Sequence, residues 1–184
     1  IELLGESVLL ALADAGIRLS EVDGVFAATA VHAMAAMSVA EYLGIQPTFS
    51  SGSNIGGSSF QAHALNAALA LEAGLCNVAV IAYGSNQRSA GGFTSISEPM
   101  PYEAVYKPRY PVAAYALAAA RHMHLYGTTR EHLAEVAVAA RAWANLNPEA
   151  FARGPLSIED VLGARMICDP LGKLDCCLVT DGGA

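Results

Sequence analysis

Apolar positions along the first part of the chain recur with the spacings of alternating helices and strands. Leucines and valines at every third or fourth position predict a helix over residues 2–16 that ends at a glycine. A short strand is predicted over residues 22–28, a second helix over 33–44 and an extended segment over 47–53. This alternation predicts an α/β fold with a mostly parallel sheet and right-handed crossovers.

A glycine–serine turn, Gly56-Gly57-Ser58-Ser59, opens an alanine-rich helical segment that ends at Gly74, and an apolar strand is predicted over residues 78–83. The first N–H groups of a helix have no partner within the helix, and the helix dipole is positive at that end. The turn therefore presents hydrogen-bond donors to whatever lies above it, as at an anion-binding or active-site turn.

The periodic pattern fails between residues 86 and 111, where serine, glycine and four prolines are mixed with three tyrosines. Irregular segments of this length are uncommon and often functional. Helical spacing returns over residues 111–127 and 129–145, the latter with Thr128 or Thr129 as its cap, and a short helical segment is expected at 157–162. The tail from residue 169 is rich in turn residues, and a further strand is expected to begin at its end.

Composition fits one soluble α/β domain of 184 residues. The hydrophobic share is 54%, but each apolar run is interrupted before the roughly 20 residues that a membrane-spanning helix requires. The formal net charge of −7 argues against broad nucleic-acid binding, which needs a basic face. No basic leader precedes Ile1, so a cytoplasmic protein is expected.

The cysteines and histidines do not form a metal pattern. Cys176 and Cys177 are adjacent and the other two cysteines stand alone, so we expect reduced thiols rather than a disulfide framework or a zinc site. His122 and His124 are two residues apart and cannot share a helical face. We therefore expect no metal site.

Two further residues have plain structural interpretations. Cys76 follows the alanine-rich helix and is interpreted as a small buried residue at the start of a strand. His63 lies about a turn and a half into that helix, where a hydrogen-bonded core or interface histidine is favoured over a catalytic base.

Residues 56–62, the helix to Gly74, the strand to Gly84, and segments 122–128 and 174–184 together resemble the thiolase superfamily, and within it the sterol-carrier-protein-X or lipid-transfer-protein branch. In that family two similar halves each form a five-stranded mixed sheet, and the paired halves enclose buried helices. The resemblance implies that this chain is most of one half. The first strand, expected at the centre of the sheet, would precede Ile1 and the fifth would follow Ala184, which indicates a fragment or an incompletely built chain.

The resemblance also implies a division of the chain. Residues 1–85 and 165–184 would form the thiolase-like half, with a mixed, mostly parallel sheet lacking its first and last strands. Residues 86–164 would form a loop and helical insertion that covers the active site. Within it Tyr102, Tyr106, Arg109 and Tyr110 could line the acyl pocket or meet the phosphates of CoA. The alternative is a solvated loop with its aromatic residues packed beneath it.

In the family, the turn before the buried helix carries the cysteine that takes the acyl group from CoA. The family spacing places this cysteine at Gly57, so the thiol is missing here. Ser58 and Ser59 are poor substitutes, because a shift of one residue turns a helical side chain by about 100°. The N–H groups around Gly57, Ser58 and Ser59 remain as donors. The pair Cys176 and Cys177 matches a structural pair of the branch, which implies core positions.

Three hypotheses follow, all with a CoA thioester as ligand and no bound cofactor. The first is retro-aldol cleavage of a β-hydroxyacyl-CoA in lipid or steroid side-chain breakdown, with the base in the absent half. The second is a non-catalytic subunit that completes a hetero-oligomer. The third is acyl transfer with Ser58 as the nucleophile, which the lack of an activating base disfavours. The resemblance implies a homodimer, or pairing with a small OB-fold partner.

Overall fold

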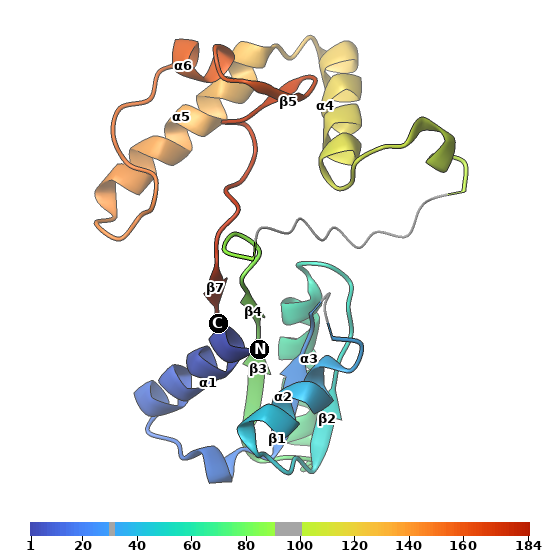
Figure 1. Ribbon diagram of the computed structural model, residues 1–184, viewed down its shortest axis with the longest axis vertical. Coiled ribbons are helices and arrows are strands. Elements are labelled where there is room, and N and C mark those ends of the chain that lie inside the picture. Colours follow the sequence, from blue (N-terminus) through green and yellow to red (C-terminus); the bar gives the residue numbers. More distant parts are fainter. Residues whose placement is uncertain (30–31, 91–100) are drawn as a thin grey trace. The chain divides into compact units, whose positions relative to one another are not determined.

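The structure is a computed structural model that describes residues 1–29, 32–90 and 101–184 (Figure 1). It divides into two compact units, of which the first contains residues 1–94 and 179–184 and the second residues 95–178. Residues 165–178 therefore belong to the second unit, whereas the sequence interpretation grouped them with the thiolase-like half. The candidate turn lies in the first unit.

The first unit contains the predicted parallel sheet. Strands β1 (Gly24–Ala27), β2 (Phe49–Ser51) and β3 (Ala79–Ala82) are all parallel, in the order β2-β1-β3. The register pairs Gly24 with Phe49 on one side and with Ala79 on the other. Strand β1 bonds directly to both neighbours in this sheet, and the expectation that the first and last family strands are absent stays a prediction.

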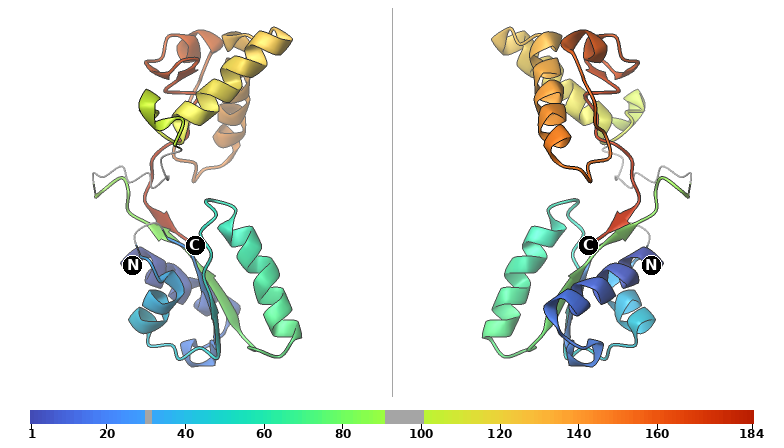
Figure 2. Two further views of the ribbon diagram at one scale, coloured as in Figure 1. Left: turned by 90° about the vertical axis from the view of Figure 1, so that its right-hand side faces the viewer. Right: turned by 90° about the vertical axis from the view of Figure 1, so that its left-hand side faces the viewer.

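Helices cover both faces of the sheet, which gives three layers (Figure 2). Helices α1 (Glu2–Ala15) and α2 (Ala35–Leu43) pack on one face, against Val25 and Ala27 of β1. Helix α3 (Ser59–Glu72) packs on the other, against Phe26. The alternation arises because successive side chains of a strand point to opposite faces. The α/β prediction is confirmed.

The last residues of the chain return to the first unit and form an antiparallel strand pair there. Strand β4 (Gly84–Ser85) pairs antiparallel with β7 (Gly182–Gly183), which confirms the strand expected at the end of the tail and the mixed character of the fold. Asp181 fixes this return, because its carboxylate accepts hydrogen bonds from the N–H groups of Arg88 and Ser89. Burial alone would raise the pKa of Asp181, but the bonds from Ser89 and Arg88 outweigh it and the pKa is lowered.

The second unit is built from helices and a small hairpin. The long helices α4 (Val112–Tyr126) and α5 (Arg130–Leu146) confirm the two predicted helical spans. Helix α5 packs on the short helix α6 (Ile158–Leu162), in which Val161 is buried. Ser157 caps α6 by accepting a hydrogen bond from the N–H of Asp160. The other described elements are η2 (Ala104–Tyr106), β5 (Met166–Cys168) and β6 (Leu171–Gly172).

None of the helices in the described ranges is long and apolar enough to cross a membrane.

The start of the sheet is held together by Asp23, which precedes β1. Its Oδ1 accepts hydrogen bonds from the N–H groups of Asn77 and Val78, each at 2.8 Å, and its Oδ2 accepts one from the Asn77 amide at 2.8 Å. The bond from Val78, followed by those from Asn77, lowers the pKa of Asp23 because these donors favour the ionised carboxyl. One charged side chain thus links the first ends of β1 and β3.

The Asp23→Ala variant is expected to unfold at a lower urea concentration than the wild type at pH 7, and the gap should narrow in acid. The pKa is lower in the folded state, so the contribution of Asp23 is present above the unfolded pKa of about 4 and is lost as the pH falls through the folded pKa. Urea unfolding between pH 7 and pH 3 measures it. Asp14→Ala, on the exposed side of α1, is the control; a gap that did not narrow in acid would contradict the prediction.

Candidate functional site

The turn between β2 and α3 is closed by the side chain of Ser59. Its hydroxyl donates to the Gly56 carbonyl oxygen at 2.7 Å and accepts from the Ile55 N–H at 3.0 Å. Gly56 adopts φ +76°, a conformation that favours glycine. Ser59 is completely buried, and its own N–H donates to the Gly56 carbonyl oxygen at 3.1 Å. Neither its hydroxyl nor its N–H is available to a ligand, so the expected donor at Ser59 is corrected.

Gly57 and Ser58 are the exposed part of the turn. Among the described residues, no side chain accepts a hydrogen bond from the N–H of either residue, and Gly57 forms an isolated parallel β-bridge with Ile55. A Cβ placed on Gly57 would have no atom within 4 Å, so the space above this residue is open. In the amide orientation that satisfies both its oxygen and its nitrogen, Gln61 donates to the carbonyl oxygens of Gly57 at 3.2 Å and Ser58 at 3.3 Å, which ties their carbonyl side to α3. The two N–H groups remain as donors at the end of a 14-residue helix.

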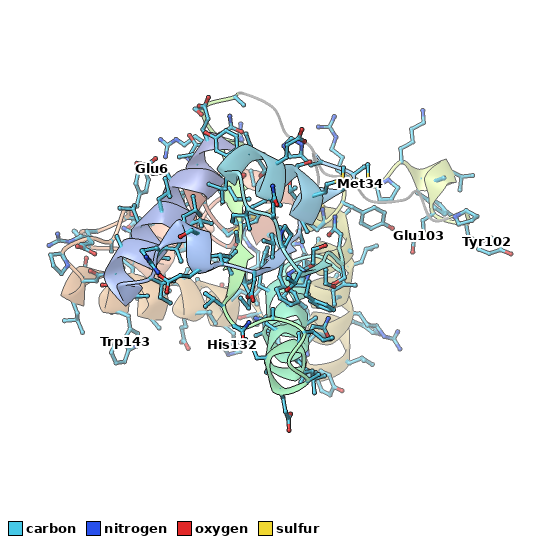
Figure 3. The ribbon with its side chains drawn as sticks, turned by 90° about the horizontal axis from the view of Figure 1, so that it is seen from below. Glu6, Met34, Tyr102, Glu103, His132 and Trp143 are labelled. Carbon is cyan, nitrogen blue, oxygen red and sulfur yellow. The ribbon has the colours of Figure 1, made fainter. Side chains whose placement is uncertain are left out.

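A cavity of about 320 Å³ lies where β1 and β2 end and the loop toward the turn begins. Ser53 and Asn54 form part of its polar wall, and Met34 and Met37 are among its exposed apolar residues. Met34 is labelled in Figure 3. Asn54 connects the cavity to the turn, because its Oδ1 accepts a hydrogen bond from the Gly56 N–H at 3.3 Å. Ligands of parallel α/β sheets commonly bind at the carboxyl ends of the strands.

A second cavity of about 530 Å³ lies beside the start of α1 and β4. His32 contributes to the walls of both cavities.

His63 lies one helical turn beyond Ser59, inside α3. It is completely buried and its Nε2 lies 3.2 Å from both the N–H nitrogen and the hydroxyl of Ser53. The ring packs against Phe26 and, edge-on, against Phe60. The prediction of a hydrogen-bonded core histidine is confirmed.

Comparison with known proteins places this architecture in a family. No protein-family profile matches the sequence. The chain is 35% identical, over 99% of its length, to the 17-hydroxy-3-oxo-4-pregnene-20-carboxyl-CoA lyase of Mycobacterium tuberculosis. It is also 35% identical, over its whole length, to a steroid side-chain-cleaving aldolase of Thermomonospora curvata. The solved Ltp2-ChsH2(DUF35) aldolase superposes on 99% of the chain with a TM-score of 0.81 and 34% identity.

The chain belongs to the thiolase superfamily. Within it, the chain falls in the SCP2-thiolase-like branch that contains the Ltp2 aldolase, as the sequence resemblance predicted. An SCP2-thiolase-like protein of Mycobacterium smegmatis superposes on 99% of the chain with a TM-score of 0.73 and 26% identity, covering 40% of that protein. The chain spans 50% of the length of each of the two curated relatives and 48% of the solved aldolase chain.

None of the four cysteines of this thiolase-like chain occurs within the turn. Cys76 is buried directly beneath Gly24, and burial, followed by the charge of Asp23, raises its thiol pKa. Its interpretation as a small core residue is confirmed. Burial likewise raises the pKa of the half-buried Cys176. Cys177 is exposed, so its expected core position is wrong, because it lies in the irregular segment after β6.

The expected substrate-binding residues of the insertion belong to the second unit. Tyr102 and Tyr106 are 91% and 83% exposed, and Figure 3 shows Tyr102 extending outward beside η2. They are not packed beneath the loop, which removes that alternative for these two residues. Arg109 is exposed and Tyr110 half-buried. Residues 91–100 of the loop lie outside the described residues, and the binding role of the four residues stays a prediction.

No group of three or more histidine, cysteine, aspartate or glutamate residues that could hold a metal ion occurs in the described ranges.

The sequence analysis missed the residues whose side chains form hydrogen bonds with the turn and with the loop before it. Asn54 and Gln61 bond its backbone, and Ser53 connects the preceding loop to His63. Asparagine two residues before a glycine is a signal for a side-chain-bonded turn, and could have indicated Asn54. No local signal indicates the contact between Ser53 and His63, because it joins a loop to the second turn of a helix.

Proposed function

We propose that the protein acts in the retro-aldol cleavage of a β-hydroxyacyl-CoA. A base removes the proton of the β-hydroxyl group, and the oxygen forms a carbonyl as the bond between Cα and Cβ breaks. The electron pair of that bond passes to Cα and the thioester oxygen as an enolate, and a proton then adds at Cα. The products are a ketone or aldehyde and a shortened acyl-CoA, so the reaction needs neither an oxidant nor an acyl-enzyme.

One observation carries the proposal: the turn keeps hydrogen-bond donors at Gly57 and Ser58 but has open space instead of a thiol. Donors aimed at a developing oxyanion stabilise an enolate as they would a tetrahedral intermediate. The names of the M. tuberculosis and T. curvata relatives support carbon–carbon cleavage of a steroid side chain, in the former case as a CoA ester.

In this reaction, different residues of the chain would bind different parts of the substrate. The Gly57 and Ser58 N–H groups hold the thioester oxygen, and the cavity beside Asn54 receives part of the acyl group. Tyr102, Tyr106, Arg109 and Tyr110 are proposed to contact the CoA ester. We expect the base to come from the half of the relatives that this chain does not match.

Incubation of the full-length protein, with and without a DUF35 partner, with a steroid β-hydroxyacyl-CoA tests the proposal. Mass spectrometry should detect the steroid ketone and the shortened acyl-CoA in equal amounts, with no consumption of free CoA. Iodoacetamide should leave the rate unchanged, because no thiol takes part. Absence of cleavage under both conditions would refute the lyase proposal.

A binding role as part of a hetero-oligomer is the second candidate. The solved Ltp2-ChsH2(DUF35) aldolase is named for two components, and we propose a similar DUF35 partner for this chain alongside a homodimer. Complex formation without cleavage, measured by size-exclusion chromatography and the assay above, would favour this role.

Acyl transfer through Ser58 has weaker support. The acetyl-CoA acetyltransferase of Methanothermobacter thermautotrophicus is 29% identical over the whole chain, covering 50% of that protein. However, the Ser58 hydroxyl makes no hydrogen bond to a base within the described ranges. An unactivated serine is a weak nucleophile. Free CoA consumption that is lost in Ser58→Ala would revive this hypothesis.

A further inference from the structure

His63 has a geometry that goes beyond filling the core. We propose that it is a positioning residue for the candidate active-site turn, and that it acts through Ser53 to fix the loop from which the Gly57 and Ser58 donors project. The inference rests on the proposed function for its catalytic consequence. Its structural part concerns the loop alone and can be tested separately.

The direction of the hydrogen bond defines the state of the ring. The Ser53 N–H can only donate, so Nε2 of His63 must accept it at 3.2 Å. An accepting Nε2 carries no proton, which places the single ring proton on Nδ1. Nε2 of His63 thus serves as an acceptor built into the buried face of α3.

The protonated nitrogen has no compensating contact. Nδ1 of His63 is buried and finds no hydrogen-bond partner within the described part of the chain. An unpartnered buried donor costs about 1–3 kcal/mol. An apolar side chain could fill the same space without this cost, but it could not accept the Ser53 N–H. The arrangement thus gives up stability while keeping one hydrogen bond to the loop.

That hydrogen bond reaches the active-site turn in two steps. Ser53 is followed by Asn54, whose side chain bonds the Gly56 N–H, and Gly56 is bonded in turn by Ser59. Ser59 and His63 are four residues apart and lie on the same face of α3. Two residues on one face of α3 therefore form these hydrogen bonds. Ser59 bonds the turn itself, and His63 bonds the loop before it.

Two aromatic neighbours restrict the orientation of the His63 ring. The His63 ring lies 6.2 Å from the Phe26 ring and 6.0 Å, at 90°, from the Phe60 ring, measured between centroids. Such packing restricts the rotation of the side chain. Nε2 is thereby held toward Ser53, which is the requirement for a group that positions another.

Two substitutions separate packing from hydrogen bonding. His63→Phe keeps an aromatic ring and removes the acceptor, whereas His63→Gln supplies an amide oxygen near the position of Nε2. Val8→Ala is the control, because it creates a cavity on the opposite face of the sheet without touching the loop. Hydrogen exchange of the bonded amides of Ile55, Gly56 and Ser59 is compared with that of β1 in each variant, and steady-state cleavage of the β-hydroxyacyl-CoA is measured in parallel.

We expect exchange at Ile55, Gly56 and Ser59 to rise at least tenfold over that of β1 in His63→Phe, and less than threefold in His63→Gln. The kcat should fall at least tenfold in His63→Phe with KM within threefold, and His63→Gln should recover most of it, because the donors act mainly on the transition state. Uniform exchange across the unit, equal losses in Phe and Gln, or the same kcat loss in Val8→Ala would overturn the inference. An inactive wild type would refute the lyase proposal alone, since the exchange comparison would still decide the positioning role.

Discussion

The Gly57→Leu variant should lose at least 100-fold in kcat/KM for β-hydroxyacyl-CoA cleavage while its free energy of unfolding stays within about 0.5 kcal/mol of the wild type. The leucine side chain would enter the open space above Gly57, where the thioester oxygen is proposed to meet the N–H groups. Loss of oxyanion-type donors typically lowers kcat by about 10²–10³-fold. Initial rates and urea unfolding measure the two quantities.

The stability half of this prediction depends on the local geometry. No atom lies within 4 Å of a Cβ at Gly57, and its φ is not in the left-handed region, so a side chain causes neither a clash nor backbone strain. Gly56→Leu is the contrasting variant, because φ +76° at Gly56 makes any side chain strained. It should lose both activity and stability. Full activity in Gly57→Leu would show that the chemistry does not occur at this turn.

Local sequence signals were sufficient to locate the elements. The glycines expected to end helices adopt left-handed φ values of 68°, 71° and 69° at Gly16, Gly44 and Gly127. Such ends are determined by neighbours only a few residues away, since the missing Cβ removes the penalty for this conformation. This is why the helix boundaries follow from the sequence to within one or two residues.

The order of the strands could not be obtained in the same way. Alternating helices and strands predict parallel pairing, but they do not say which strands are neighbours. The direct pairing of β1 with β3 joins Gly24 to Ala79, 55 residues apart in the chain. The first strand that the family resemblance expected before Ile1 stays a prediction, because the pairing of the described strands does not test it. Cys177 was expected in the core but is exposed. Its burial depends on contacts with segments far away in the sequence, which a local pattern does not reveal.

The position of the candidate site was predictable from the sequence, but the hydrogen bonds that hold the turn were not. The turn and the missing thiol follow from Gly57 and its distance to Gly74. The selection among three adjacent donors required coordinates, because only the observed bond from the Ser59 N–H to Gly56 shows that this donor is occupied. A hydrogen bond such as that between Ser53 and His63 depends on how a helix docks on a sheet, which no local pattern records.

Phe26→Ala should destabilise the first unit by about 3–5 kcal/mol, the range for truncating a fully buried phenylalanine. Phe26 is 0% exposed, and its ring lies 5.8 Å from that of Phe49 and 6.2 Å from that of His63. It lies between the sheet and α3, so alanine would leave a cavity that these rings cannot fill without moving. Urea unfolding, fitted to the transition of the first unit, measures the loss.

Leu65→Ala on α3 is the matched control for this substitution. It also truncates a large apolar residue to alanine, but Leu65 is 62% exposed and little burial is lost. Its free energy of unfolding should change by less than about 1 kcal/mol, since alanine also has a high helix propensity. Equal losses in the two variants would mean that α3 does not form its core contact through Phe26. A selective loss in Phe26→Ala would instead show that the layer supporting His63, and through it the turn, depends on this one ring.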